Sequence, residues 1–155
     1  FRKLKFKDFL PYFDIMAVSL WLGWGIGRIG CFLTHLHPGK LTSFFLAVNY
    51  PGGARFDLGL AESIAGFALF AIFTVLFKRM VKKRWGLVAF YSAASYAAVR
   101  FFLDFLRSAP QEYLGGDIRY WFLTPAQWGM LAVMVALGIV ALLRTSKFKV
   151  SKLSG

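Results

Sequence analysis

Arg28 places a fixed positive charge in an apolar, glycine-rich stretch that runs Gly25-Ile-Gly-Arg-Ile-Gly-Cys-Phe32. A guanidinium group stays protonated, so within a bilayer it must either reach the membrane surface or meet negative charge. Because charged residues inside membrane spans are functional candidates by default, Arg28 is predicted to bind an anion, with an interfacial anchor as the structural alternative. Gly23 and Gly27 form a small-xxx-small pair that is expected to let another helix approach closely.

A second charged face is predicted on a later helix, where Arg100, Asp104 and Arg107 follow i, i+4, i+7 spacing. Glu62 adds one carboxylate from the segment between them. A guanidinium fork matches phosphate oxygens, so these groups together with Arg28 would suit a phospholipid headgroup. The structural alternative is a set of ion pairs that only fixes helix packing.

Composition identifies the solvent around these charges. Hydrophobic residues make up 58% of the chain, and several apolar runs are long enough to cross a bilayer. The net charge of +12 lies mostly in short clusters between these runs, which is typical of topology signals and excludes nucleic acid as a partner. The single cysteine excludes an internal disulfide and leaves no zinc-ligand spacing, so no metal or cofactor is expected.

These apolar runs predict an all-α polytopic membrane protein with four transmembrane helices, organised as a single domain over residues 1–155. The expected helices cover about 13–36, 58–77, 85–107 and 124–144, and a basic tail follows at 145–155. Between the first two helices, His37 to Asp57 contains repeated turn formers and is predicted to be an ordered loop. Thr124 and Pro125 start the fourth helix as a hydroxyl cap and a first-turn proline.

Lysine and arginine gather before Pro11, at residues 78–84 and in the tail. The positive-inside rule then puts both chain ends in the cytoplasm and the two longer loops outside. In this frame Arg28, Glu62 and Arg100 lie roughly 6 to 12 Å below the outer ends of their helices, at 1.5 Å per residue. The charges therefore share one layer in the outer leaflet, open towards the external headgroups.

Four segments resemble, in order and approximate spacing, signature elements of the bacterial prolipoprotein diacylglyceryl transferases. They are Gly-Arg28-Ile-Gly30-Cys31-Phe, Gly59-Leu-Ala-Glu62, Arg100-Phe-Phe-Leu-Asp104-Phe-Leu-Arg107 and Leu123-Thr-Pro-Ala-Gln127. The resemblance implies the C-terminal part of a seven-helix fold in the bacterial inner membrane. The chain is accordingly expected to be a partial or divergent member of this family, because these residues do not include the family's N-terminal helices.

The resemblance also implies a reaction, the transfer of the diacylglyceryl group of phosphatidylglycerol to the lipobox cysteine thiol of a preprolipoprotein. A thioether forms, glycerol 1-phosphate is released, and the partners are phosphatidylglycerol and the preprolipoprotein signal peptide, with no cofactor. Such chemistry needs cations for the phosphodiester and a base for the thiol. The matching positions imply catalytic roles for Arg28, Arg100 and Asp104, and substrate-binding roles for Gly30, Gly39, Glu62, Arg107 and Gln127.

Three positions depart from the family pattern. Cys31 stands where the family usually has asparagine, Ala61 where a tyrosine is common, and Leu36 near a position that is usually acidic. A missing acid could be replaced by His35 or His37, because histidine titrates near neutrality and both lie at the outer mouth. His35 is the favoured base because it shares a helix face with the first arginine.

Two other functions fit the same residues. One is a non-catalytic relative that binds anionic phospholipid, which Leu36 and Ala61 favour. The other is a small anion transporter subunit that uses Arg28 and Arg100 as its path. The transporter is the weaker alternative, because the charges share one depth instead of lining a pore from side to side.

Overall fold

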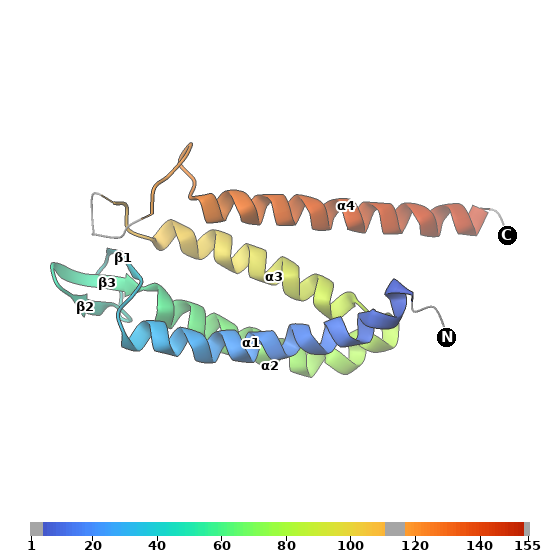
Figure 1. Cartoon of the computed structure of the whole chain (residues 1–155), viewed down its shortest axis with the longest axis horizontal. Coiled ribbons are helices and arrows are strands. Elements are labelled where there is room, and N and C mark those ends of the chain that lie inside the picture. The colour runs from blue at the N-terminus through green and yellow to red at the C-terminus, as the bar shows by residue number, and fades with distance from the viewer. Residues whose placement is uncertain (1–4, 111–116, 154–155) are drawn as a thin grey trace.

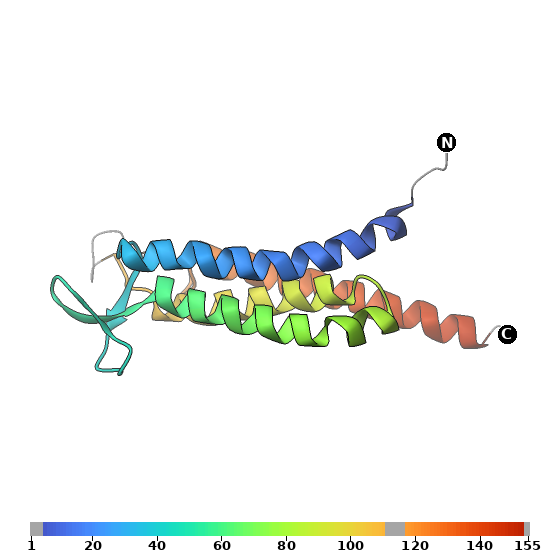
Figure 2. The same ribbon diagram turned by 90° about the horizontal axis from the view of Figure 1, so that it is seen from below.

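The computed structural model of the chain describes residues 5–110 and 117–153, with side chains described as far as residue 143. Within these residues, long helices lie side by side and a small sheet covers one end of the bundle (Figure 1). The helices are α1 (Leu10–Leu33), α2 (Leu58–Lys83), α3 (Leu87–Leu103) and α4 (Pro125–Leu153), with the short 3-10 helices η1 (Phe6–Phe9) and η2 (Asp104–Leu106). The start of α1 and the end of α4 both lie at the end of the bundle away from the sheet (Figure 2).

The chain is mostly helical, as expected, but the prediction of an all-α protein with four membrane spans is wrong in two respects. Among the described residues, three segments are long and apolar enough to cross a membrane: Phe6–Leu33, Leu58–Lys83 and Pro125–Leu143. The remaining helix, α3, has only 17 residues, because the chain tightens into η2 at Asp104 instead of continuing as α-helix to Arg107. The segment between α1 and α2 also contains β-strands.

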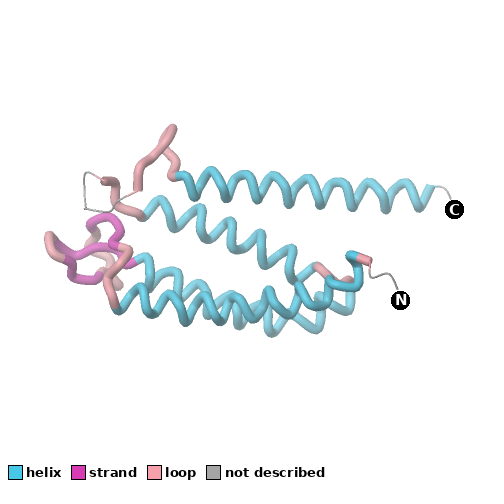
Figure 3. Tube along the Cα trace, viewed as in Figure 1, coloured by secondary structure: helices cyan, strands magenta, loops and turns pink. Residues whose placement is uncertain are grey.

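The predicted loop over His37 to Asp57 is a three-stranded antiparallel sheet with the order β1-β3-β2 (Figure 3). Its strands are β1 (Pro38–Leu41), β2 (Val48–Tyr50) and β3 (Gly53–Asp57). Strands of three to five residues are too short for an alternating pattern to emerge from the sequence. The turn formers were correctly recognised, since Gly52 and Gly53 at the β2–β3 turn have φ angles of +92° and +125°.

β3 runs directly into α2, and Asp57 marks the junction as the N-cap. Its Oδ1 accepts a hydrogen bond from the backbone N–H of Leu60 at 2.9 Å, which satisfies one of the free donors at the helix start. The direction of α2 is thereby tied to the sheet. The start of this helix is the element that carries Glu62 to the same end of the bundle.

The other helix ends differ from the predicted ranges. α1 begins and ends three residues earlier than expected, and α3 is shorter at both ends. α2 continues past residue 77 to Lys83, and α4 continues through the expected tail to Leu153. Lysine and arginine are good helix formers, so the end of an apolar run does not mark the end of the helix.

α1 and α2 approach most closely at Gly25 and Gly66. A Cβ atom on Gly66 would lie 2.8 Å from the Cα of Gly25, whereas a Cβ on Gly23 or Gly27 would meet nothing within 4 Å. The close helix approach expected at Gly23 and Gly27 therefore occurs at Gly25 instead, on the other side of α1. Small residues allow such contact where the backbones themselves must touch.

Trp21 joins three helices in the apolar middle of the bundle. It packs with Phe73 of α2 and Val88 of α3, and its indole N–H donates to the hydroxyl of Ser92 at 2.6 Å. This small core and the Gly25–Gly66 contact fix α1, α2 and α3 relative to one another.

Asp14 provides a further tie at the end of the bundle away from the sheet. It is fully buried on α1, and its two oxygens accept hydrogen bonds from the backbone N–H groups of Gly86 and Ala89 at 2.6 and 2.8 Å. Gly86 has a φ angle of +86°, a conformation that suits glycine at the tight connection between α2 and α3. α3 is thus anchored to α1 at its first turn.

Candidate functional site

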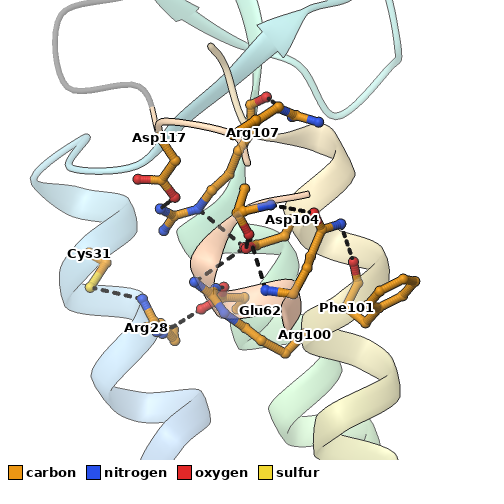
Figure 4. A network of polar contacts seen from close by, with 11 residues as sticks. Arg28, Cys31, Glu62, Arg100, Phe101, Asp104, Arg107 and Asp117 are labelled. Carbon is orange, nitrogen blue, oxygen red and sulfur yellow. Dashed lines mark hydrogen bonds and ion pairs between the residues drawn. The ribbon is translucent and has the colours of Figure 1, made fainter. Parts of the chain in front are cut away.

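Glu62 lies at the meeting point of three helices, in the second turn of α2, with its side chain 1% exposed (Figure 4). Its Oε2 lies 2.5 Å from the Nε of Arg28 on α1, and its Oε1 forms an ion pair with Arg100 on α3. Guanidinium groups from two helices therefore share one buried carboxylate from a third. Charge-assisted pairs of this kind are strong and directional.

Arg100 also contacts a second carboxylate, that of Asp104 one turn later. Its NH2 lies 3.2 Å from the Oδ1 of Asp104, as the i, i+4 spacing predicts. The same oxygen lies 3.4 Å from the Nε of Arg107, because the tighter η2 brings the residue three positions on into reach. Asp104 is fully buried and holds both arginines.

Thr124 joins the first turn of α4 to this cluster. Its hydroxyl donates to the Oδ2 of Asp104 at 2.5 Å and accepts from the backbone N–H of Gln127 at 3.2 Å. The side-chain oxygen of Gln127 in turn accepts from the backbone N–H of Thr124 at 2.9 Å, which completes a reciprocal capping box. The Thr-Pro pattern predicted the cap but not its contact with the carboxylate, since nothing in the spacing links residues 104 and 124.

Gln127, which was expected to bind substrate, is fully buried. Its amide nitrogen donates to the backbone carbonyl of Phe101 at 3.0 Å, while its oxygen is engaged at the helix cap. Both polar atoms of the amide thus fasten α4 to α3. In this arrangement Gln127 acts on the arginine cluster through Thr124.

Gly39 brings the sheet against the charged end of α3. A Cβ atom there would lie 2.6 Å from the carbonyl oxygen of Leu106 and 2.9 Å from Phe56, so the contact requires glycine. Gly39 forms an isolated β-bridge with Arg107.

Arg107 also contacts the segment that leads to α4. Its guanidinium group pairs with Asp117, and its backbone carbonyl accepts a hydrogen bond from the guanidinium of Arg119 at 3.2 Å. Asp117 and Arg119 were not predicted as site residues, because a loop contact leaves no periodic pattern in the sequence.

Cys31 and Gly30 lie next to Arg28 on the last turn of α1. The terminal NH1 of Arg28 makes only a weak contact of 3.9 Å with the sulfur of Cys31. A Cβ on Gly30 would meet nothing within 4 Å, so space is open at this position. An arginine carries five N–H donors, and the contacts described for Arg28 leave donors available for a further anion.

The two histidines have different surroundings. His35 is 51% exposed, its Nδ1 lies 3.8 Å from the Oδ2 of Asp57, and its ring packs edge-on to that of Tyr50 at 5.1 Å. His37 instead lines a small polar cleft of about 20 Å³, together with Leu36, Pro38, Leu58, Arg107, Ser108 and Asp117. A space of this size holds about one water molecule.

The pKa of His37 lies below its ordinary value of 6.5. Burial is the largest cause, and the positive charges of Arg107, Arg28 and Arg100 lower this pKa further, against an opposing contribution from Asp57. The imidazole is therefore neutral near pH 7. The role of base that the sequence assigned to His35 stays a prediction, but His37 is the histidine whose pKa all three arginines lower.

Together, the fold and this cluster define a class of protein: a helical membrane protein that holds an arginine–carboxylate cluster at one end of its bundle. A family model described as prolipoprotein diacylglyceryl transferase matches residues 1–144. The chain therefore belongs to the prolipoprotein diacylglyceryl transferase family, which confirms the resemblance in the sequence motifs.

Curated relatives agree with this family. The chain is 33% identical over 138 residues to a phosphatidylglycerol–prolipoprotein diacylglyceryl transferase of Chromohalobacter salexigens, which covers 86% of the chain and 49% of the relative. It is 34% identical over 112 residues to the enzyme of the same name from Sinorhizobium medicae, and this match covers 68% of the chain and 40% of the relative. It is 26% identical over 149 residues to the phosphatidylglycerol–prolipoprotein diacylglyceryl transferase 2 of Clostridium perfringens, and this match covers 92% of the chain and 54% of the relative.

The chain thus spans about half the length of the curated relatives that it matches. No solved structure matches it. With its three long apolar helices and its bacterial relatives, the protein is placed among bacterial membrane proteins.

Proposed function

We propose that this chain takes part in the transfer of the diacylglyceryl group of phosphatidylglycerol to the lipobox cysteine thiol of a preprolipoprotein. A thioether forms and glycerol 1-phosphate leaves. The observation that carries the proposal is the placement of Glu62 between Arg28 and Arg100, which holds two guanidinium groups from separate helices at one buried point. Family membership and the printed names of the relatives support the same reaction.

The arginines have a defined task in this reaction. The phosphodiester of phosphatidylglycerol has one negative charge, and the departing glycerol 1-phosphate gains a second as the carbon–oxygen bond breaks. Donors that are already aimed at the leaving phosphate stabilise this charge without reorganising. In our proposal Arg28 and Arg100 bind the phosphate, and Arg107 contacts it from the edge of the site.

The carboxylates keep these arginines in position. Glu62 is shared by Arg28 and Arg100, and Asp104 is shared by Arg100 and Arg107. Each guanidinium group thus keeps a fixed orientation while its remaining N–H donors can contact the lipid. Asp104 takes part in this proposal as the group that orients Arg100.

The glycines and Gln127 support the site in our proposal. Gly30 leaves space beside Arg28 for the headgroup, and Gly39 lets the sheet close against η2. Gln127 holds the first turn of α4 in place. Protein substrate would enter as a signal peptide whose lipobox cysteine reaches the phosphate layer from the membrane.

We also propose an orientation, with both chain ends cytoplasmic and the site facing the outer leaflet of the bacterial inner membrane. The basic clusters favour it through the positive-inside rule. The start of α1 and the end of α4 lie at one end of the bundle and the arginine cluster at the other, which agrees with this orientation (Figures 1 and 4).

A non-catalytic relative that binds anionic phospholipid is the second candidate. It is favoured by the departures from the family pattern at Cys31, Leu36 and Ala61. Such a protein would use the same arginines for binding and lack turnover. The two candidates therefore predict the same lipid contact but different products.

A reconstitution experiment separates the candidates. The full chain in proteoliposomes is given phosphatidylglycerol with a labelled diacylglyceryl group and a lipobox peptide, and the peptide mass is measured. A thioether-linked diacylglyceryl adduct supports the transferase, and a matched peptide with serine in place of the lipobox cysteine gives none. Binding of phosphatidylglycerol without formation of the peptide adduct indicates a lipid binder. Movement of anions across the vesicle membrane indicates a transporter. Either result contradicts the transferase.

A further inference from the structure

Trp24 lies one helical turn before Arg28 on α1, and the guanidinium group of Arg28 lies over its indole ring. The Cζ of Arg28 is 5.9 Å from the centre of the ring. A cation at this distance is attracted by the negative charge of the aromatic face, and tryptophan provides the strongest contact of this kind. The attraction acts on the charge of the whole group, so it uses none of the five N–H donors of the guanidinium.

Glu62 holds the same guanidinium at a second point. Its Oε2 lies 2.5 Å from the Nε of Arg28, and the terminal NH1 makes only the weak contact of 3.9 Å with the sulfur of Cys31 (Figure 4). Arg100 is held differently, because both of its terminal nitrogens are paired with carboxylates. The described contacts of Arg28 therefore leave more terminal N–H donors for an anion than those of Arg100.

The ring of Trp24 is itself held by other aromatic residues. It packs edge-on to Trp21 and to Tyr96 of α3, with 5.4 Å between ring centres in both pairs. Trp21 is fixed in turn, since its indole N–H donates to Ser92 at 2.6 Å and its ring stacks on Phe73 of α2 at 6.4 Å. Contacts from three helices thus determine where the indole of Trp24 lies before any lipid binds.

We propose that Trp24 is a positioning residue for lipid binding, which holds Arg28 in the orientation that meets the phosphate of an anionic phospholipid. The inference rests on the proposed function, in the part that its two candidates share, namely the contact between Arg28 and the lipid phosphate. An arginine side chain has many rotamers, and ordering it during binding lowers affinity. Trp24 and Glu62 order it in advance, so the phosphate meets a guanidinium that is already in place.

A purely structural role for Trp24 is the alternative, and it depends on a different property of the ring. Packing depends on the size and apolar character of the indole, whereas the attraction to Arg28 depends on the negative charge of the ring face. Fluorine atoms on the indole separate the two properties, because they withdraw electrons from the face and add little volume. Trp24 is half-buried and borders an apolar groove of about 510 Å³ between α1 and α3, which leaves room for them.

The test uses the full chain in phosphatidylcholine nanodiscs, with labelled phosphatidylglycerol as the probe. Tryptophan analogues with one, two and four fluorine atoms are incorporated at position 24 alone, and the affinity for phosphatidylglycerol is measured for each. A desolvated cation–π contact corresponds to about a factor of 10 in an equilibrium constant, so we expect a stepwise loss that reaches about 10-fold with four fluorine atoms. An affinity that does not change along the series would overturn the proposal.

Two substitutions provide the same contrast without unnatural residues. Trp24→Phe keeps a ring with a weaker attraction for cations, and Trp24→Leu keeps only an apolar side chain, so affinity should fall from wild type to Phe to Leu. Trp85→Leu is the matched control, since it removes an indole that is 42% exposed at the connection between α2 and α3, and it should bind the lipid as wild type does. Equal losses in Trp24→Phe and Trp24→Leu would contradict the proposal.

The failures are distinguishable. If wild type binds phosphatidylglycerol no better than phosphatidylcholine, the proposed function fails and the role of Trp24 with it. If wild type prefers phosphatidylglycerol and the fluorinated proteins keep that preference in full, only the role of Trp24 fails, and its contacts with Trp21 and Tyr96 are packing alone.

Discussion

Two buried carboxylates lie at opposite ends of the helix bundle, and their partners differ in kind. Asp14 and Glu62 are 0% and 1% exposed, so burial does not distinguish them. Asp14 accepts hydrogen bonds from two backbone N–H groups at the start of α3. Glu62 instead faces guanidinium groups of Arg28 and Arg100.

This difference separates a structural charge from a candidate site. Each backbone N–H is a single donor, so the contact with Asp14 leaves nothing for a ligand, and the helix start adds favourable electrostatics. Each guanidinium carries five donors, of which the carboxylate uses only some. The charge at Glu62 therefore positions groups that can bind a second anion, whereas the charge at Asp14 fastens α1 to α3.

Replacing Arg100 with alanine should have the largest effect, because Arg100 joins the Glu62 and Asp104 carboxylates. Hydrogen bonds to charged groups contribute about 1.5 to 3 kcal/mol, so the lost guanidinium contact should lower phosphatidylglycerol affinity by about 10- to 100-fold. Binding is measured in nanodiscs with and without the anionic lipid.

The matched control is Arg84→Ala, which removes the same charge from an exposed position on the connection between α2 and α3. It should bind the lipid as wild type does. If Arg100→Ala and Arg84→Ala bind equally well, Glu62 and Asp14 belong to one structural class and the contrast between the two ends disappears.

Sequence spacing predicted the contacts that lie within one helix, and it predicted that the charges of three helices lie at one level. Arg100 and Asp104 are paired as the helical period requires, and Arg28, Glu62 and Arg100 meet at one level. These inferences succeed because the rise and period of a helix are fixed by backbone hydrogen bonding.

The remaining features depend on contacts between distant segments. The bond from Thr124 to Asp104 and the pair formed by Arg107 and Asp117 join residues with no common period. The β1–β3 sheet was hidden in strands too short to show alternation. The different surroundings of the two histidines likewise come from tertiary packing, since both were predicted at the same outer mouth.

Asp14→Asn should lower stability and leave lipid binding intact, which tests whether Asp14, unlike Glu62, has only a structural role. Each hydrogen bond to a charged group contributes about 1.5 to 3 kcal/mol, and the amide keeps one acceptor while presenting a donor to a backbone N–H. We expect a loss of about 3 kcal/mol in the free energy of unfolding, measured in mixed micelles. Asp8→Asn, outside α1, is the control and should change it little. A folded Asp14→Asn protein that no longer binds phosphatidylglycerol would argue that both ends belong to the site.

Thr124→Val tests how far the site depends on α4. The variant removes the donor to the Oδ2 of Asp104 and the acceptor for the N–H of Gln127. Leaving a buried charged group with one partner fewer costs about 2 kcal/mol of stability, and lipid affinity should fall several-fold as Asp104 loses its orientation. Thr124→Ser retains the hydroxyl and should behave as wild type in both measurements. Equal loss in the Val and Ser variants would show that the hydroxyl contacts do not account for the effect, and would contradict an orienting role of Thr124.

Ser63→Ala should have the smallest effect, although Ser63 follows Glu62 directly on α2. Its hydroxyl donates to the carbonyl of Gly25 at 2.9 Å, a neutral contact between α2 and α1. Hydrogen bonds between membrane helices average about 0.6 kcal/mol, because the separated helices find other partners in the membrane. The free energy of unfolding should fall by about this amount, with no change in lipid affinity. An effect on affinity close to that of Arg100→Ala would mean that helix packing, and not guanidinium charge, controls the lipid contact at this end of the bundle.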